Sequence, residues 1–468
     1  MFPAVPEPAL AELGRTEGGA GTLGMLVRDQ DTRRLLLLRA VLDAAEAADP
    51  ALCPPAAKAR LREDWALLTA ADRAAAPGSP ARTRLGHPLL GPWARRCLTR
   101  LDPRGGVPGD EQRRELVRDL AYFSAVAAVA AARAGITFTS DLTAREGILV
   151  LPSLGALHTP ERGDARLRVT YDRGRMELGQ ATVHLESDGG AWSGSLAWTS
   201  AYALPGLVPG APAMPLDDLD PYRAPPREAG RPAAVGPAAP DESERKRWLQ
   251  PWTGTAAALR GGGEGRLTEA LALLRCLVPM ELPPGAGSRG RCSGTRPEAF
   301  GALFSTAPVT PVAFAATLVH ELQHAKLVAL GELVELHRAG PAARYFAPWR
   351  PDPRPYDGLL QGAYSHLALA DFFQRRALAA GPARSEGAAG AWAEYARYHA
   401  QVGAALPALA GSADLTTAGR RFVDAMAATH ERLAAHPAPR GHTARAQAYV
   451  KAARTLWTQR QPRGESRK

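Results

Sequence analysis

Residues 315–330 read AATLVHELQHAKLVAL, in which two histidines and a glutamate follow the HExxH pattern. No proline lies between Pro311 and the end of this segment, and its alanine and leucine content predicts a helix. Residues four positions apart lie on the same face of a helix, so His320 and His324 can present two imidazole nitrogens to one metal ion. Glu321 lies about 100° around the helix, where it can reach a metal-bound water or orient a ligand.

The residues around the motif favour a metal site over two simpler explanations, a chance match and an exposed histidine pair. The chain has 11 histidines in 468 residues, which makes an accidental HExxH uncommon. The apolar neighbours Leu318, Val319 and Leu322 indicate that the helix is at least half buried. Buried imidazoles are better explained by a ligand than by burial alone, so the sequence predicts a metal centre on this helix.

The third metal ligand determines the chemistry, and the positions directly after the motif do not supply it. The metzincin pattern requires a glycine and a histidine where this chain has Leu327 and Leu330. Glu335 and His337 lie about 16 Å or more of helix rise beyond His324, too far to share the ion unless the helix breaks. A third ligand is therefore expected from another helix.

His366 is the next candidate, because it lies on a second expected helix. Gly362 and Ala370 lie on its own face of that helix, and such small residues let two helices approach closely. We predict that His366 completes the metal site. Two alternatives stay open, namely a histidine that is satisfied in the core, and ligation by Asp371 or Glu335 instead.

A proline-rich loop precedes that second helix, with prolines at 348, 351, 353 and 355 that stiffen it into an extended segment. Arg350 and Arg354 lie in this loop, and a guanidinium pairs with a carboxylate through two parallel hydrogen bonds. The loop therefore suits a carboxylate clamp beside the metal. The plainer interpretation, that both arginines are ordinary surface residues, also stays open.

The predicted fold class is α+β and mostly helical, with a helical HExxH catalytic domain and a small β-rich unit. Helical periodicity comes first, short β-branched runs follow, and proline and glycine then dominate before helical character returns. In the last region we expect breaks in helical character at 281–296 and 347–357. The expected organisation is a helical N-terminal region (1–135), a β-rich unit (136–205), a Pro/Gly-rich linker or arm (206–240), a helical metal-binding catalytic domain (241–458) and a disordered tail (459–468).

Composition limits the classes of function. The formal net charge is +10, but the basic residues are spread along the chain, so no nucleic-acid partner is expected. The four cysteines are scattered, which argues against a zinc knuckle, a redox pair or a disulfide framework. No signal peptide is recognised after Met1, and the most apolar stretch, 121–134, is too short to span a bilayer. We therefore expect a soluble, cytoplasmic protein with no membrane partner.

Several segments together resemble one known family. They are FGA at 300–302, LVHELQH at 318–324, APWRPDPRP at 347–355 and GLLQGAY at 358–364. They are similar to the HExxH-motif peptide-modification proteins of actinobacteria, which occur beside genes for ribosomal peptide biosynthesis. The resemblance is strongest between residues 290 and 375 and fainter elsewhere. HExxH is moderately specific by itself and much more specific when joined to the other segments.

The resemblance implies an iron(II)- and 2-oxoglutarate-dependent hydroxylase that acts on the β-carbon of a residue in a ribosomally made precursor peptide. His320 and His324 would bind iron, and our geometric argument adds His366. Three histidines depart from the usual triad of two histidines and a carboxylate, but they leave positions open for bidentate 2-oxoglutarate and O2. The precursor peptide is the expected partner, and the basic net charge suits an acidic leader segment.

The resemblance also suggests roles for the other candidate residues. Arg354 or Arg350 would pair with the distal carboxylate of 2-oxoglutarate, with Gln361 as a hydrogen-bond donor. Glu321 would orient a ligand or hold a water rather than act as a protease base.

Two other functions stay open. Imidazole suits zinc as well as iron(II), so the spacing does not choose the metal. A zinc-dependent HExxH peptidase would use Glu321 to activate a zinc-bound water. A non-catalytic peptide-binding protein would carry a structural metal, which normally has four protein ligands that usually include cysteine; Cys292 is the cysteine that folding would have to bring to it.

Overall fold

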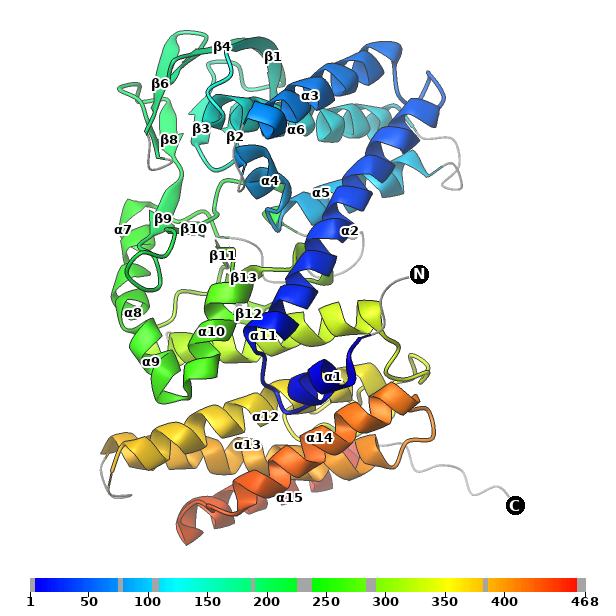
Figure 1. The fold of residues 1–468 in the computed structure, drawn as a ribbon, viewed down its shortest axis with the longest axis vertical. Helices are drawn as coiled ribbons and strands as arrows, with labels where there is room; N and C mark the ends of the chain where they lie inside the picture. Colours follow the sequence, from blue (N-terminus) through cyan, green and yellow to red (C-terminus); the bar gives the residue numbers. More distant parts are fainter. Residues whose placement is uncertain are drawn as a thin grey trace.

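The structure is a computed structural model, and it describes residues 5–74, 79–102, 109–186, 190–224, 238–282, 292–381 and 386–460. The chain has the predicted α+β, mostly helical fold. Figure 1 shows two parts stacked along the long axis, with the N-terminal helices and two sheets above and the C-terminal helices below. Residues 225–237 of the predicted linker and 461–468 of the predicted tail lie outside the described residues.

The upper part packs helices against two antiparallel sheets. Its helices are α3 (Pro55–Ala74), α4 (Pro80–Leu85), α5 (Leu90–Leu101) and α6 (Asp110–Arg133). One sheet has the order β1-β4-β5-β6-β7, with bounds Phe138–Ala144, Ala165–Asp172, Arg175–Leu178, Ala181–Leu185 and Ala191–Trp192. The other has the order β2-β3-β8, with bounds Ile148–Leu151, Gly155–His158 and Trp198–Ser200. The alanine-rich end of α6 is buried, because small side chains let α3 and β1 pack close to its axis.

The lower part is a layered set of helices around the HExxH segment. Helix α11 (Pro311–Leu333) carries the motif, α12 (Tyr356–Ala379) packs against α11, and α13 (Glu386–Ala410) packs against α12. The remaining helices are α1 (Glu7–Gly14), α7 (Glu242–Lys246), α8 (Leu249–Thr253), α9 (Thr255–Gly261), α10 (Glu264–Leu273), α14 (Thr417–Ala434) and α15 (Arg440–Arg460). Figure 1 shows α11 and α12 crossing the molecule as neighbouring layers.

A mixed five-stranded sheet lies above α11 in Figure 1, and the sequence prediction missed most of it. Its order is β12-β13-β11-β10-β9, with bounds Ser293–Gly294, Ala302–Ser305, Cys276–Pro279, Met214–Leu216 and Tyr202–Leu204. The expectation of helical character at 276–279 and 302–305 is wrong. Both are four-residue strands in which every position is buried, and so short an apolar run does not reveal its period.

Helix α2 (Ala20–Ala47) joins the two parts. Near its start, Leu23 and Leu26 belong to the lower hydrophobic core, and further along Leu38, Val41 and Ala45 belong to the upper core. Figure 1 shows this helix running diagonally from one part to the other. A single continuous helix buried at both ends therefore ties the upper part to the part that holds the HExxH motif.

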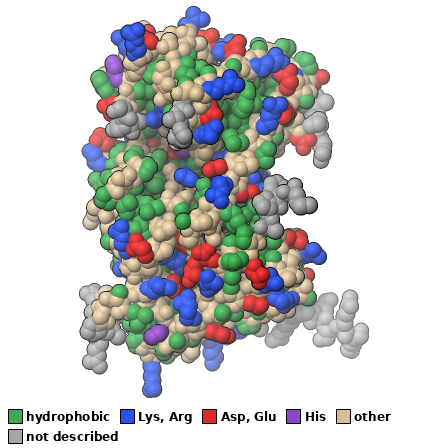
Figure 2. All heavy atoms as spheres, viewed as in Figure 1, with side chains coloured by type: hydrophobic (Ala, Val, Ile, Leu, Met, Phe, Trp, Pro, Cys, Tyr) green, Lys and Arg blue, Asp and Glu red, His purple; other side chains and the backbone are tan. Residues whose placement is uncertain are grey.

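None of the helices in the described residues combines the length and apolar character needed to cross a bilayer. Figure 2 shows basic and acidic side chains interspersed over the face that it draws. The net charge of +10 is therefore not gathered into one continuous basic surface on that face.

Candidate metal centre

Helix α11 begins at a capped end and holds the HExxH motif in the core. Thr310 is the N-cap residue, and its hydroxyl accepts a hydrogen bond from the Ala313 amide at 3.1 Å. Pro311 follows in the first turn, where its missing N–H has no helical partner to lose. Most side chains between Phe314 and Leu330 are buried, so packing holds the helix on several faces.

His320 and His324 face each other one turn apart on α11. Their Nε2 atoms lie 3.1 Å apart, and the planes of their rings cross at 78°. Nδ1 of His324 lies 3.0 Å from Oε1 of Gln361 on α12. An amide oxygen only accepts, so this contact places the proton of a neutral His324 on Nδ1 and leaves a lone pair on Nε2. Gln361 thus orients His324, which differs from the cofactor hydrogen bond expected of it.

His366 brings a third imidazole to this pair from α12. The centroid of its ring lies 5.6 Å from that of His320. Trp349 and Tyr398 pack against the ring edge-on, with centroid separations of 4.6 and 5.0 Å. Nδ1 of His366 is buried and has no hydrogen-bond partner among the described residues. An unpaired buried polar atom of this kind costs about 1–3 kcal/mol, and a metal ion would supply the missing partner.

The separations of the His320 ring from the other two rings are close to those of imidazoles that share one metal ion. A ring bound at about 2.1 Å has its centroid about 3.3 Å from the ion, so two such rings at about 100° lie about 5 Å apart. The centroid separations are 4.7 Å for His320 and His324 and 5.6 Å for His320 and His366. The three histidines do not form a closed set of ligand atoms in this structure, so one or more of the rings would have to move for all three to hold one ion.

Burial disfavours the charged form of these imidazoles. It lowers the pKa of His320 well below its usual value, and the neighbouring His324 and His366 add to the effect. It also lowers the pKa of His366 to about 3, with further contributions from Arg397 and His324. Neutral imidazole is the form that binds a metal. The side chain of His320 keeps 26% of its surface exposed, so the site is open to a ligand from solvent.

Glu321 lies next to this group and is held by the edge strand of the mixed sheet. Its carboxylate accepts a hydrogen bond from the hydroxyl of Ser293 at 2.7 Å and another from the side chain of Thr295. Burial raises the pKa of Glu321, and these two hydrogen bonds oppose the rise. Its Oε1 lies 4.0 Å from Nε2 of His320. A water bound near His320 would therefore be within reach of this carboxylate.

The structure separates the two arginines of the proline-rich loop. Nε of Arg350 donates to Asp352 at 3.0 Å, and both side chains are about half exposed. Arg354 instead packs over Gly358 in the first turn of α12, where an added Cβ would lie 2.8 Å from its Nη2. Its Nε is buried and has no hydrogen-bond partner among the described residues. Nη1 of Arg354 lies 4.0 Å from Oδ2 of Asp352, a longer contact than that of Arg350. Of the two arginines, Arg354 therefore has the looser contact with Asp352 and a buried Nε that could donate to another carboxylate.

Arg354 and Gln361 are connected through α12. Gly358, under the Arg354 guanidinium, and Gln361 are three residues apart, so they share a face of the helix with about 4.5 Å of rise between them. Gln361 in turn contacts His324. Gly358, which the guanidinium packs over, is thus about one helical turn from the residue that contacts His324, a candidate metal ligand.

Sequence reasoning missed four residues that contact the predicted site. Ser293 and Thr295 hold Glu321, while Trp349 and Tyr398 pack against His366. Trp349 lies inside the proline-rich segment 347–355, and this position is the one sequence feature that indicates that Trp349 lies near the site. No local pattern marks the other three, because each reaches the site through tertiary packing.

Substitution of Gly362 by alanine is expected to weaken metal binding about 10-fold. A Cβ at this position would lie 2.4 Å from Cζ2 of Trp349, so the indole must move, and with it the ring that packs against His366. Displacement of a group that positions a metal ligand commonly lowers metal affinity about 10–100-fold. The expected effect here is at the lower end of that range. Competition of Zn²⁺ with a chromophoric chelator measures the change.

Gly331→Ala is the matched control for that substitution. Gly331 lies near the end of α11, and an added Cβ meets no atom within 4 Å. Alanine there is expected to stabilise the helix slightly and to leave zinc affinity unchanged. Equal zinc affinity for Gly362→Ala and the wild type would contradict the positioning of His366 by Trp349.

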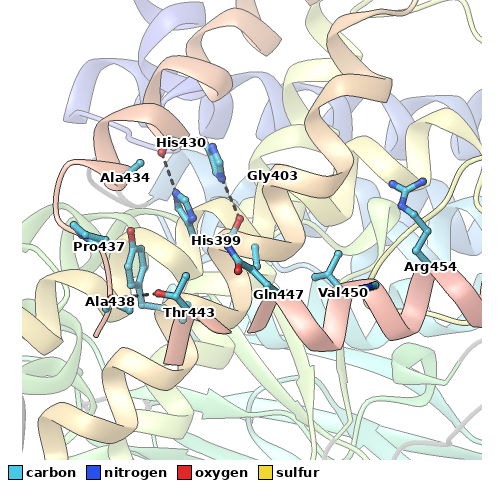
Figure 3. A pocket seen from close by; sticks show the side chains of 14 residues that line it. His399, Gly403, His430, Ala434, Pro437, Ala438, Thr443, Gln447, Val450 and Arg454 are labelled. Atoms are coloured by element: carbon cyan, nitrogen blue, oxygen red, sulfur yellow. Dashed lines mark hydrogen bonds between the residues drawn. The ribbon is translucent and has the colours of Figure 1, made fainter. Parts of the chain in front are cut away.

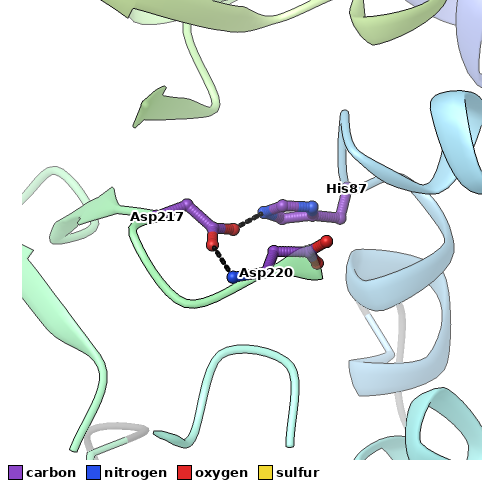
Figure 4. Close-up of side chains that lie close together, drawn as sticks. All are labelled: His87, Asp217 and Asp220. Atoms are coloured by element: carbon purple, nitrogen blue, oxygen red, sulfur yellow. Dashed lines mark hydrogen bonds and ion pairs between the residues drawn. The ribbon is translucent and has the colours of Figure 1, made fainter. Parts of the chain in front are cut away.

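A second cluster, formed by His87, Asp217 and Asp220, also has the spacing of a metal site (Figure 4). Nε2 of His87 lies 3.1 Å from Oδ2 of Asp217, while its Nδ1 accepts a hydrogen bond from the Leu89 amide at 3.3 Å. In the neutral ring Nε2 therefore carries the proton and has no lone pair for a metal. Burial, and then the nearby charge of Arg84, lower the pKa of His87 to about 4. We assign this cluster no metal.

A scan of the chain against protein-family models gives no match, and a search of curated proteins also gives no match.

Proposed function

We propose that this chain is an iron(II)- and 2-oxoglutarate-dependent hydroxylase that acts on the β-carbon of a residue in a ribosomally made precursor peptide. The observation that supports it most is the buried Nε of Arg354, whose guanidinium packs over Gly358 about one turn along α12 from the residue that contacts His324. The likeness of segments 300–302, 318–324 and 347–364 to the HExxH peptide-modification family points the same way.

In this proposal the three histidines bind the metal, and Gln361 orients one of them. His320, His324 and His366 would bind iron(II) through neutral imidazole nitrogens, and Gln361 would keep the His324 lone pair directed at the ion. When bound, iron(II) and 2-oxoglutarate supply the oxidation: one atom of O2 enters the substrate C–H bond, and the other leaves in succinate as CO2 is released. Three protein ligands leave positions open for these molecules.

Arg354 would bind the cosubstrate, and Glu321 would hold a water or a ligand. The Arg354 guanidinium would bind the distal carboxylate of 2-oxoglutarate and so fix the direction in which the keto acid approaches the metal. Glu321, held by Ser293 and Thr295, would accept a hydrogen bond from a water or ligand beside His320. The exposed part of His320 marks the side from which the peptide would approach.

The experiment that tests the proposal is metal analysis of anaerobically purified protein, followed by succinate release after addition of iron(II), 2-oxoglutarate and air. We expect succinate formation that depends on iron and is suppressed by zinc. With the cognate precursor peptide present, the peptide should gain the mass of one oxygen atom. Tightly bound zinc and no consumption of 2-oxoglutarate under any of these conditions would count against the proposal.

Substitution of Arg354 by glutamine is expected to raise the KM for 2-oxoglutarate about 10–100-fold, because the variant loses a charge-assisted, bidentate contact to the carboxylate. The kcat at saturating 2-oxoglutarate should change much less, since the clamp contacts the cosubstrate away from the reacting carbon. Initial rates of succinate release over a range of 2-oxoglutarate concentrations separate the two parameters.

Arg350→Gln is the comparison for that result. Arg350 already pairs with Asp352 at 3.0 Å, so its loss is expected to change the KM less than about 2-fold. A large increase in the KM for Arg350→Gln and none for Arg354→Gln would show that Arg350 is the residue that binds the carboxylate.

A zinc peptidase is the second candidate, and the position of Glu321 favours it. A carboxylate oxygen 4.0 Å from the Nε2 of a metal-binding histidine is placed to take a proton from a metal-bound water, and its pKa is raised by burial as a general base requires. This function would give peptide cleavage in the presence of zinc without 2-oxoglutarate. The same preparations that are tested for succinate distinguish the two candidates.

A further inference from the structure

A cavity of about 530 Å³ lies between α13, α14 and α15 (Figure 3), a volume within the range of small-molecule binding sites. Helix α13 separates it from the candidate metal centre. Tyr398 of α13 packs against His366, whereas the next residue, His399, lines the cavity. The cavity is therefore a second site on the other side of the helix, and the proposed hydroxylation makes no use of it.

The walls of the cavity are mostly apolar, and small side chains create the space. Ala396, Ala400 and Gly403 line it from one face of α13, at intervals of four and three residues. Val450 and Gln447 line it from α15 on the opposite side. An apolar ligand body would thus lie between two helices in a cavity that is partly open to solvent, and burial of part of its surface favours its transfer from water.

A stacked histidine pair forms one end of the cavity. The rings of His399 and His430 lie 3.9 Å apart at 11°, and each Nε2 donates to the other residue's main-chain carbonyl at 3.2 and 3.0 Å. Burial lowers the pKa of His399 to about 4 and also lowers the pKa of His430. Both rings are therefore neutral at pH 7, and this end of the cavity carries no charge.

The other end of the cavity is positively charged. Arg454 lines this end, with its guanidinium stacked over the ring of Phe346 at 4.4 Å, and Lys451 lines the cavity three residues earlier on α15. None of the described lining residues is acidic. Figure 3 shows Arg454 at the opposite end of the α15 lining from the histidine pair. Helix α15 as a whole contains five basic residues and no acidic residue, so nothing on it neutralises the two cations.

We infer that this cavity binds an amphipathic carboxylic acid, with its apolar body between α13 and α15 and its carboxylate at Lys451 and Arg454. A partly open apolar cavity alone would accept any hydrophobic molecule of this size. The cations at one end favour an anionic head, because charge-assisted hydrogen bonds replace the water that a carboxylate loses on binding. A cationic head at the same place would be repelled.

Isothermal titration calorimetry of the full chain with sodium decanoate tests this inference. We expect one saturable site per chain, and decyltrimethylammonium, which has the same alkyl chain and the opposite charge, should bind at least about 10-fold more weakly. Lys451→Glu is expected to weaken decanoate binding at least about 10-fold and to reduce or reverse the preference for the anion. Lys451 is exposed, so this variant is expected to fold normally.

Two further variants locate the site. Arg445→Glu makes the same change in net charge on α15 but at an exposed position that does not line the cavity, so decanoate affinity should stay within about 2-fold. Ala400→Leu fills the cavity without changing charge and should abolish saturable binding. The inference is overturned if decanoate gives no saturable heat up to about 1 mM. It is also overturned by equal affinity for the two head groups, or by unchanged binding in Lys451→Glu and Ala400→Leu.

Discussion

Replacement of His324 by alanine is expected to eliminate metal binding at α11 and, with it, turnover. His324 presents its Nε2 lone pair 3.1 Å from Nε2 of His320, and Gln361 holds it in that orientation. Loss of a residue that only orients a ligand costs 10–100-fold in metal affinity, so loss of the ligand itself should cost at least about 1,000-fold. Chelator competition with Fe²⁺ and Zn²⁺, followed in parallel with succinate release, measures both effects.

His436→Ala is the control for this prediction. His436 is exposed near the end of α14, so the same substitution there should leave metal stoichiometry and affinity unchanged. The thermal unfolding of both metal-free variants should resemble that of the metal-free wild type, since His324 is only partly buried. A His324→Ala protein that retains one equivalent of metal with wild-type affinity would place the site elsewhere.

The helix that carries the candidate metal site can be predicted from sequence because its signal is local. The four-residue spacing of His320 and His324 has the same meaning in any helix, and the apolar neighbours predict its burial. The sequence also predicts that His366 approaches His320, but close packing of the two helices at Gly362 is not the reason for it in the structure. The structure uses that glycine for a different contact, the indole of Trp349.

The contacts of the site that cannot be predicted from sequence are those between segments far apart in the chain. Ser293 reaches Glu321 from a strand 28 residues earlier, and no pattern within either segment fixes that contact. Arg350 and Arg354 are equivalent in sequence, and only the packing of Arg354 over Gly358 separates them. The same limit applies to the strands at 276–279 and 302–305, whose short apolar runs fit a helix or a strand equally well.

A buried charge network behind the HExxH helix is a further feature with no local signal, since Lys, Arg and Glu are ordinarily expected on the surface. Lys326 is two residues after His324 and fully buried, and its Nζ donates to Glu269 at 2.7 Å and to the Glu17 carbonyl at 3.0 Å. Arg266 pairs with the same carboxylate at 3.2 Å. The network therefore joins α10, α11 and the segment after α1 beside the HExxH histidines.

Glu269 is the common acceptor of this network, and Glu269→Gln is expected to destabilise the chain by about 3–5 kcal/mol. Burial opposes ionisation of Glu269, but the charges of Lys326 and Arg266 outweigh it and lower its pKa. Burial also lowers the pKa of Lys326 to about 8, with Glu269 opposing that shift. Without the carboxylate charge, Lys326 must either stay a buried cation with main-chain carbonyls as acceptors or give up its proton, and either change costs free energy. Urea unfolding at pH 7 measures the loss.

Glu264→Gln, on the same helix, makes the same chemical change at an exposed residue whose contact to Arg260 is 3.6 Å long. It is expected to lower the free energy of unfolding by less than about 0.5 kcal/mol.

The double variant Glu269→Gln/Lys326→Met should be more stable than Glu269→Gln alone, because it removes the lysine together with the carboxylate that paired with it. A double variant that is less stable than the single one would show that Lys326 stabilises α11 through its carbonyl contacts and packing more than its charge costs. The network would then act on the HExxH helix as a positional anchor to the N-terminal segment, independent of the ion pair.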